Sequence, residues 1–375
     1  MIVVTGTGIV SAIGTNTPEV AHALLADISG IAPVRFLETQ HRQMPVGEVK
    51  LSNEQLAQRL GVPCTANTSR TMLLGTLALR EALATAGINS EKLADVALVS
   101  GTTVADMDCV ERHFDAAQSN NALGDCGRST QEMVQNVGPF GYVTTCSTAC
   151  SSAANAFILG ANLLRSGRFK QVVVGGTECL SRFHFNGFRS LMILDGEPCR
   201  PFDDTRAGLN LGEGAAFVVL ETAEHATQRG VEALAELSGW GNACDAFHQT
   251  ASSDDGIGAV LSMRQALKRA ALQPADIDYV NAHGTGTPNN DASESAALHS
   301  VFGEKVPPVS STKSRTGHTT SASGSIEAVI CLLAMRQGFI PSNLNWQHAM
   351  ANGIVPVAQT LRQQHLRHGL WNAFG

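Results

Sequence analysis

The stretch YVTTCSTACSSAANAF, residues 142–157, sets the pattern on which the rest of the chain is built. Its β-branched residues predict the end of a strand, and the apolar residues from Ala153 to Leu164 predict a helix that ends before Gly167. Cys150 falls at the junction, on the first turn of the expected helix. Because free N–H groups at a helix N-terminus stabilise negative charge, we expect a thiolate at Cys150 and an oxyanion held by its backbone N–H.

Cysteine is also a common core residue, and we interpret most of the nine cysteines in the chain in this way. The spacing of Cys146 and Cys150 is compatible with a shared metal ion, but no CxxC pair or second group of ligands accompanies them. We therefore expect no metal site. Taken alone, the junction leaves a structural and a catalytic role for Cys150 equally open.

The composition excludes several classes of protein. Of the 375 residues, 43% are apolar and 16% are charged, which suits a large core and is unlike a disordered chain. No run of about 18 apolar residues occurs, and the first ten residues lack the basic start of a signal peptide. The net charge of −7 argues against general nucleic-acid binding, and the irregularly spaced cysteines indicate a reducing, cytoplasmic compartment.

Helices and buried strands alternate along the chain in an order that occurs twice. In the first half we expect a helix, a strand, a helix and a strand, at residues 69–87, 95–101, 151–166 and 171–176. In the second half the corresponding helix, strand and helix are expected at residues 259–272, 276–282 and 323–336. A repeat of about 180 residues is too long for a solenoid, so we predict two related α/β halves, residues 1–225 and 226–375.

The N-terminal stretch TGTGI invites comparison with a dinucleotide-binding loop. Gly6 and Gly8 match its first two glycines, but Ser11 stands where the third is required. The dinucleotide hypothesis is therefore weak.

One histidine of the second half follows an apolar strand, in the stretch VNAHGTGTP at residues 280–288. His283 is surrounded there by small residues, at the end of a strand where α/β folds place their sites. Asp291 and Glu294 come next, in a spacing close to a capping box, and we interpret both as structural.

A second histidine stands in the stretch STKSRTGH, residues 311–318. Lys313 and His318 lie there among small polar residues, and Glu327 follows on a helix that mirrors the helix after Cys150. A single histidine is usually structural, but this grouping of a base, a cation and an acid favours a site.

Six motifs resemble, in the same order, those of the β-ketoacyl-acyl-carrier-protein synthases. They are VTGTGIVS, TACSS, RPFDD, LGEGA, NAHGT and STKSRTGH, at residues 4–11, 148–152, 200–204, 211–215, 281–285 and 311–318. The resemblance runs along the whole chain. It implies the thiolase-like fold, an α/β five-layer αβαβα sandwich made of two duplicated halves, in a homodimer or in a heterodimer with a related subunit.

The resemblance also implies a decarboxylative Claisen condensation without a cofactor. Cys150 would accept an acyl chain, and His283 and His318 would act as neutral Nε2–H donors to the malonyl thioester of an acyl carrier protein. They would promote loss of CO₂ and stabilise the enolate, which attacks the acyl group on Cys150. Lys313, paired with Glu327, would support the histidines, and the 3-oxoacyl product would be two carbons longer.

Further roles follow from the same resemblance. Substrate-binding contacts are implied for Leu209, Thr285, Thr287 and Phe374. Docking of the acidic carrier protein is implied for Arg70 and Arg200, with ordinary solvated charges as the alternative. The sequence ends, at LWNAFG (residues 370–375), inside a stretch that resembles the loop closing the acyl pocket, so we expect the family's final strand to be missing.

Two other functions remain as hypotheses. A catalytically impaired partner subunit, like a chain-length factor, fits the missing strand but not the intact Cys150, His283 and His318. A thioester hydrolase would use the same cysteine. Among condensing enzymes, the overall length suggests a branch that serves aryl-polyene or similar pigment pathways.

Overall fold

The largest β-sheet among the described residues has six strands in the order β5-β4-β6-β7-β1-β8. Along the chain these are β1 Ile2–Val10, β4 Val96–Gly101, β5 Tyr142–Cys146, β6 Gln171–Glu178, β7 Gly214–Thr222 and β8 Ala235–Glu236. β4 lies parallel to β5 and β6, whereas β7 is antiparallel to β6 and β1. The structure is a computed structural model that describes residues 1–115, 124–248 and 251–375. In it the central strands are buried on both faces, as their continuous apolar runs predict.

The smaller sheet has three parallel strands in the order β10-β9-β13. They are β9 Tyr279–Asn281, β10 Val309–Ser310 and β13 Gly369–Trp371. Two short hairpin-like pairs complete the strands: β2 Ala32–Pro33 with β3 Pro45–Val46, and β11 Phe339–Ile340 with β12 Leu361–Arg362.

Helices cover both sheets and fill the space between them. The α-helices are α1 Thr17–Leu25, α2 Asn53–Leu60, α3 Arg70–Thr85, α4 Met107–Asp115, α5 Cys126–Val137, α6 Ser152–Arg165, α7 Arg182–Ser190, α8 Ala223–Arg229, α9 Ile257–Ala270, α10 Pro288–Phe302, α11 Lys313–Thr316 and α12 Ser323–Gln337. Three short 3₁₀ helices are η1 Ser90–Asp95, η2 Pro274–Asp276 and η3 Thr320–Ala322.

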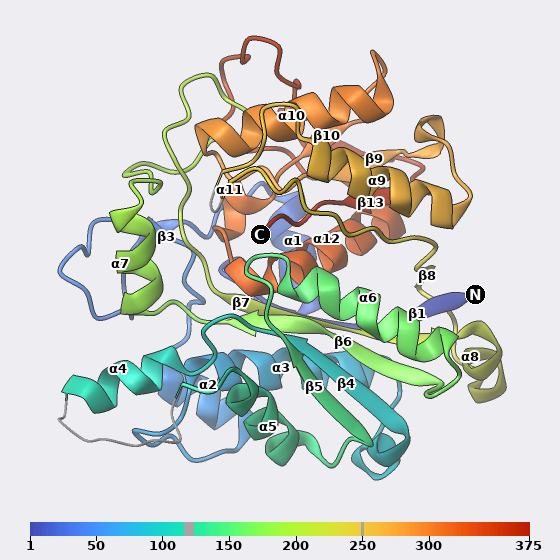
Figure 1. The fold of residues 1–375 in the computed structure, drawn as a ribbon. Coiled ribbons are helices and arrows are strands. Elements are labelled where there is room, and N and C mark those ends of the chain that lie inside the picture. Colours follow the sequence, from blue (N-terminus) through green and yellow to red (C-terminus); the bar gives the residue numbers. More distant parts are fainter. Residues whose placement is uncertain (116–123, 249–250) are drawn as a thin grey trace.

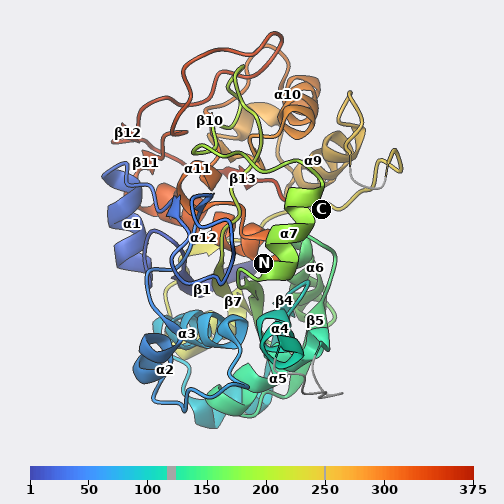
Figure 2. The same ribbon diagram turned by 90° about the vertical axis from the view of Figure 1, so that its left-hand side faces the viewer.

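Five layers follow one another through the molecule. From the bottom to the top of Figure 1 they are α3 with α5, the six-stranded sheet, α6 with α12, the three-stranded sheet, and α9 with α10. Figure 2 shows the same order from the side. The largest apolar cluster joins the six-stranded sheet to α6 and α12, and separate clusters lie under α3 and under α9 with α10. The predicted αβαβα order is therefore confirmed.

The glycines near the N-terminus serve packing and do not form a loop for a dinucleotide. Gly8 lies within β1, where a Cβ atom would stand only 2.0 Å from the carbonyl oxygen of Ala78 in α3. A Cβ on Gly6 would stand 2.4 Å from the carbonyl oxygen of Ala82. Glycine thus lets α3 approach the sheet closely.

The main predicted elements are present. The helices expected at 69–87, 151–166, 259–272 and 323–336 correspond to α3, α6, α9 and α12. The strand expected at 276–282 is shorter, since η2 occupies its start and β9 contains only three residues. The division into 1–225 and 226–375 stays a prediction, and β8, from the second of these ranges, pairs with β1 in the six-stranded sheet.

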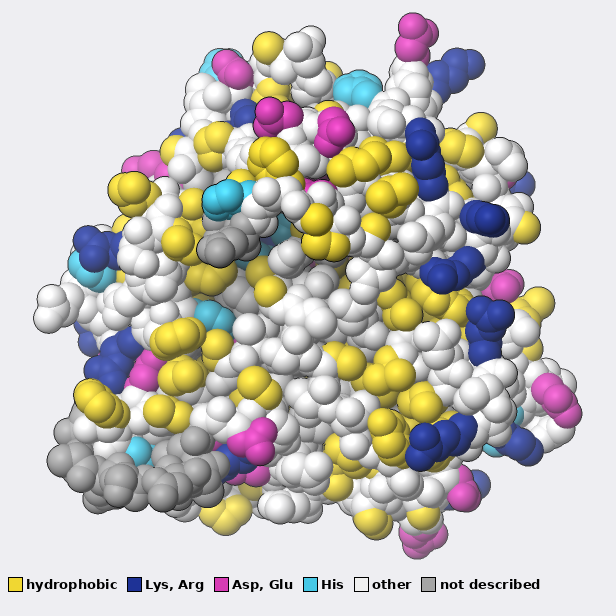
Figure 3. All heavy atoms as spheres, viewed as in Figure 1, with side chains coloured by type: hydrophobic (Ala, Val, Ile, Leu, Met, Phe, Trp, Pro, Cys, Tyr) yellow, Lys and Arg dark blue, Asp and Glu magenta, His cyan; other side chains and the backbone are white. Residues whose placement is uncertain are grey.

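Charged side chains are unevenly distributed on the face that carries β5 and α6. In Figure 3 they lie mostly around the margin of this face, and its centre is largely uncharged. In the part of the chain that the structure describes, no helix has the length and hydropathy needed to cross a membrane.

Candidate active site

Cys150 stands in a sharp turn between β5 and α6. Ala149, just before it, has a positive φ of 51°, and Ser151, just after it, is the N-cap of α6. Cys150 therefore precedes the N-cap and is not part of the first helical turn as we predicted, although it lies at the junction of strand and helix. The turn directs its side chain toward the second half of the chain, because His318 lies against it.

Both predicted histidines meet at Cys150. Nε2 of His318 lies 3.1 Å from Sγ of Cys150, although 168 residues separate them in the sequence. The ring of His283 stands perpendicular to that of His318, with 5.2 Å between the ring centroids. Each half of the chain thus contributes to one cluster, Cys150 from the first and both histidines from the second.

Lys313 and Glu327 form a buried ion pair behind His283. Nζ of Lys313 lies 3.3 Å from Nδ1 of His283 and pairs with Oε1 of Glu327. Burial raises the pKa of Glu327 to about 7, and the ammonium of Lys313 opposes this rise. A lysine ammonium has no lone pair, so it donates to Nδ1, and the ring proton of His283 must then sit on Nε2.

Both histidines are neutral at physiological pH. Burial, followed by the positive charge of Lys313, holds the pKa of His283 and of His318 well below the usual value of 6.5. Neutral imidazoles can each offer one N–H to a substrate oxygen, as the sequence led us to expect.

The thiolate expected at Cys150 is not found in the resting protein. Burial raises the pKa of the thiol to about 12, and the carboxylates of Glu178 and Glu327 act in the same direction. The positive charge of Lys313 is the main influence that lowers this pKa. The expectation was wrong because it considered only the helix N-terminus, whereas desolvation and two buried acids come from distant parts of the chain.

Two acids of α10 hold the loop that carries His283. Glu294 accepts hydrogen bonds from the backbone N–H groups of His283 (2.9 Å) and Gly284 (2.8 Å), and Asp291 accepts from Gly286 (3.2 Å). Their interpretation as structural is right, but the capping box is not, since Thr287 is the N-cap and makes no side-chain cap. Glu294 thus holds the backbone of a predicted site residue without being part of the reacting cluster.

Glu178 is a residue near the site that the sequence analysis missed. It is fully buried at the end of β6 and accepts from Thr102 Oγ1 (3.0 Å), Thr103 N (2.7 Å) and Ser321 Oγ (2.6 Å). Its position in the sequence could have indicated a site residue, because it is a charged residue at the carboxyl end of an apolar strand, where α/β folds place their sites.

The predicted substrate-binding residues lie in three places around this cluster. The ring of Phe374 lies 5.1 Å from that of His283. Thr285 and Thr287 follow His283, with their hydroxyl oxygens 2.9 Å apart. Leu209 is buried in an apolar cluster against which Phe188 packs, and Phe188 in turn lies 6.5 Å from the ring of His318.

The C-terminal residues approach the nucleophile directly. A Cβ atom on Gly375 would lie 2.9 Å from the backbone nitrogen of Cys150. Asn372 reaches the other side of the site, where its Nδ2 donates to Oε1 of Glu294 at 2.9 Å. The stretch that resembles the pocket-closing loop is therefore next to the cluster.

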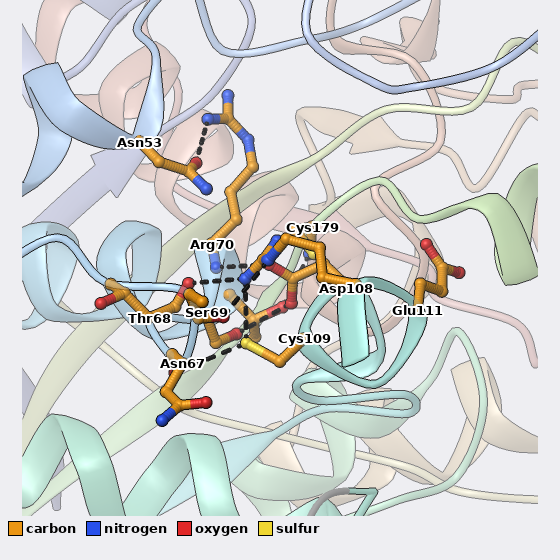
Figure 4. A network of polar contacts seen from close by, with 12 residues as sticks. Asn53, Asn67, Thr68, Ser69, Arg70, Asp108, Cys109, Glu111 and Cys179 are labelled. Atoms are coloured by element: carbon orange, nitrogen blue, oxygen red, sulfur yellow. Dashed lines mark hydrogen bonds and ion pairs between the residues drawn. The ribbon is translucent and has the colours of Figure 1, made fainter. Parts of the chain in front are cut away.

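Arg70 is not on a docking surface. Its guanidinium is buried, and Nε and Nη2 both donate to the carboxylate of Glu213, with Nη2 at 2.6 Å from Oε1. Nη1 donates to the side chain of Asn53 (Figure 4). Nη1 also donates to the carbonyl of Leu51, and Nη2 donates to the carbonyl of Val49. Its docking role is therefore wrong, because packing consumes every donor of the side chain. Arg200 keeps a partly exposed guanidinium, 3.3 Å from Asp195.

No metal ligand set is apparent among the described residues, in which no three His, Cys, Asp or Glu side chains are grouped to hold an ion. Cys146 and Cys150 are both free thiols.

Two family models together match most of the chain. Residues 1–226 match the model described as "Beta-ketoacyl synthase, N-terminal domain", and residues 234–347 match the corresponding C-terminal domain. The 3-oxoacyl-[acyl-carrier-protein] synthase 1 of Haemophilus influenzae is 32% identical over 397 aligned positions, which cover 100% of this chain and 95% of that protein.

Solved structures resemble the chain over almost its full length. The ishigamide ketosynthase/chain length factor has a TM-score of 0.91 at 29% identity and covers 99% of this chain and 95% of its own. A ketosynthase in complex with its chain length factor from Xenorhabdus doucetiae has a TM-score of 0.79 at 27% identity, with 96% and 92% covered.

Proposed function

Because the chain belongs to the β-ketoacyl synthase family, we propose that it condenses an acyl group held on Cys150 with a malonyl group carried by an acyl carrier protein. The reaction releases CO₂ and yields a 3-oxoacyl carrier thioester that is two carbons longer. The observation that carries this proposal is the partly buried contact of 3.1 Å between Nε2 of His318 and Sγ of Cys150, with the ring of His283 against that of His318.

In the first step Cys150 exchanges thioesters with the acyl carrier. Its sulfur attacks the acyl carbonyl carbon, the carrier sulfur leaves, and the thiol proton of Cys150 ends on the departing carrier thiol. Because the pKa of the thiol is raised, the sulfur anion needs local stabilisation as it forms. An Nε2–H of His318, at 3.1 Å, supplies a hydrogen-bond donor for it.

In the second step the malonyl thioester loses CO₂. The electron pair of the broken C–C bond moves into an enolate, and Nε2–H groups of His283 and His318 donate to its oxygen. The enolate carbon then attacks the acyl carbonyl, the bond from that carbon to Sγ breaks, and Cys150 leaves as the thiolate. Lys313 assists indirectly, since its bond to Nδ1 of His283 fixes the proton on Nε2.

Neutral donors suit this chemistry better than charged ones. An imidazolium would bind the malonyl carboxylate as a salt and oppose its departure as CO₂, whereas a neutral N–H acts only on the carbonyl oxygen where charge develops. The lowered pKa of both histidines supports this assignment.

A second candidate function is that of a partner subunit in a heterodimer. The likeness to ketosynthases that are paired with chain length factors supports assembly with a related subunit, either a second copy or a different chain. The complete cluster of Cys150, His283 and His318 supports the catalytic subunit of such a pair. Arg200 remains a proposed docking residue for the carrier, because part of its guanidinium is exposed.

Transfer of a radiolabelled acyl group from its carrier to the purified protein tests the proposal. We expect label on the wild type and on Cys146→Ala, a control that removes a neighbouring thiol, but not on Cys150→Ala. Addition of malonyl carrier should then yield a 3-oxoacyl carrier two carbons longer, identified by mass spectrometry. Release of the free acid alone would indicate a hydrolase, and a folded wild type without label would indicate the partner subunit.

A further inference from the structure

The far side of the His318 ring faces a hydroxyl group. Nδ1 of His318 lies 3.0 Å from Oγ of Ser323, the first residue of α12. Oγ of Ser323 also lies 3.3 Å from Oγ1 of Thr319. All three side chains are almost completely buried, so water does not compete for these bonds.

The chemistry at Nε2 decides the direction of this chain of hydrogen bonds. Once Cys150 is acylated, its sulfur has no proton to give, and the enolate oxygen is an acceptor only. Nε2 of His318 must then be the donor, so Nδ1 must present its lone pair. The hydroxyl of Ser323 can supply the proton for that lone pair, and its oxygen can accept the hydroxyl proton of Thr319.

The turn between His318 and α12 is strained and is held from outside. Thr320, a β-branched residue, has a positive φ of 46°, which is costly and persists only where the surroundings enforce it. Oγ of Ser321 donates to the buried carboxylate of Glu178 at 2.6 Å. Gly176 of β6 packs against this turn so closely that a Cβ atom on it would lie 3.0 Å from the carbonyl oxygen of Ser321. These contacts fix the position from which Ser323 reaches the ring.

We propose that Ser323 is a positioning residue for His318: its hydroxyl donates to Nδ1 and so keeps the ring proton on Nε2, where it faces Cys150 and the substrate oxygen. The inference rests on the proposed condensation, in which His318 acts as a donor. A tautomer with the proton on Nδ1 would turn an acceptor toward the enolate and oppose the reaction.

The tautomer of His318 can be observed directly. Nuclear magnetic resonance of the full-length protein, acylated on Cys150 and carrying ¹⁵N-labelled histidine rings, at pH 8, distinguishes a protonated Nε2 from a protonated Nδ1, and a His318→Ala sample identifies the signals. We expect protonation on Nε2 in the wild type. In Ser323→Ala we expect a mixture of tautomers and a roughly tenfold fall in kcat, with KM for the malonyl carrier within about twofold of the wild type.

Ser325→Ala is the matched control. Ser325 is also a buried serine near the start of α12, but its hydroxyl donates to the carbonyl of Ala322 and not to a catalytic residue. This variant should keep both the His318 signal and kcat. Protonation on Nδ1 in the wild type would overturn the inference, as would a Ser323→Ala protein with unchanged signal and turnover. If condensation itself is absent while the signals behave as expected, the proposed function fails and the role of Ser323 in setting the tautomer stands.

Discussion

At the scale of single residues, the reactivity of Cys150 depends on charges that the sequence places far from it. Glu178 lies at the end of β6 and has no ion pair among the described residues, whereas Glu327 is neutralised by Lys313. Burial is the main cause of the raised thiol pKa, and the carboxylate of Glu178 adds to it. This environment favours the thiol form of Cys150 at neutral pH.

The pH dependence of alkylation tests this description of Cys150. With a pKa of about 12, the thiolate fraction grows roughly tenfold per pH unit throughout the range from 7 to 10, so the rate with iodoacetamide should rise without a plateau. In Glu178→Gln one anion is removed and the pKa falls, so the rate at pH 9 should increase by about tenfold. Mass spectrometry of labelled peptides measures both rates.

The exposed Cys244 is an internal reference whose alkylation should be equal in the two proteins. A wild-type alkylation rate that levels off near pH 7 would show that the helix N-terminus, and not burial, determines the pKa of Cys150. Equal rates for the wild type and Glu178→Gln would remove Glu178 from the electrostatics of the site.

The sequence allowed the three reacting side chains to be named but not the state of the sulfur. Cys150, His283 and His318 each stand in a short motif of small residues, and motifs are local. The pKa of Cys150 depends on the burial of the whole cluster and on Glu178, which comes from another strand. Such a sum of desolvation and distant charges is not encoded in any single stretch.

At the scale of elements, the start of α3 also shows that a local pattern predicts an element but not the residues that it contacts. The helix itself was predicted from its periodicity, but the surroundings of its first residue, Arg70, were not. Glu213, at the beginning of β7, accepts three bonds from this arginine and further bonds from the N–H groups of Val49 and Leu180. The ion pair joins the N-terminus of α3 to the segments that follow β6 and precede β7.

Removal of Arg70 should therefore act on stability and not on recognition of the carrier. In Arg70→Ala the carboxylate of Glu213 would remain buried without its cation, and we expect a loss of about 3–5 kcal/mol in the free energy of unfolding. Arg200→Ala also leaves a carboxylate, that of Asp195, without its cation, but Arg200 is more exposed than Arg70, so we expect a smaller loss. Urea denaturation compares the two variants. An Arg70→Ala protein of wild-type stability with a raised KM for the carrier would restore the docking role.

At the scale of the whole molecule, the candidate active site combines side chains that are far apart in the sequence, since 168 residues separate Cys150 from His318. The alternation of helices and strands predicted an α/β chain with an internal repeat, and the order of the layers was implied by the resemblance to the β-ketoacyl synthases. Neither could show that η3 lies against Glu178 or that Gly375 lies against Cys150, because both contacts join segments that are far apart in the sequence. The motifs indicated the contents of the site, and packing determines its geometry.

The free edge of the six-stranded sheet predicts how two molecules associate. Within the described residues β5 pairs only with β4, which leaves its other edge open, and the opposite edge strand, β8, has just two residues. An open edge that stays unpaired favours aggregation, and the surrounding face is largely uncharged at its centre (Figure 3). We expect two β5 strands to pair antiparallel about a two-fold axis, which would bring Thr144, the middle residue of β5, opposite its counterpart.

Like charges at this position should separate the dimer, and opposite charges should restore it. Thr144→Asp alone and Thr144→Lys alone place equal charges across the axis, so each should sediment with the mass of a single chain at micromolar concentration. An equimolar mixture should recover the dimer, because every mixed pair joins an aspartate to a lysine. Dimers that persist in both single variants would show that association uses another surface. A wild type that is monomeric alone, and dimerises only with a related ketosynthase subunit, would show that β5 pairs with a different chain.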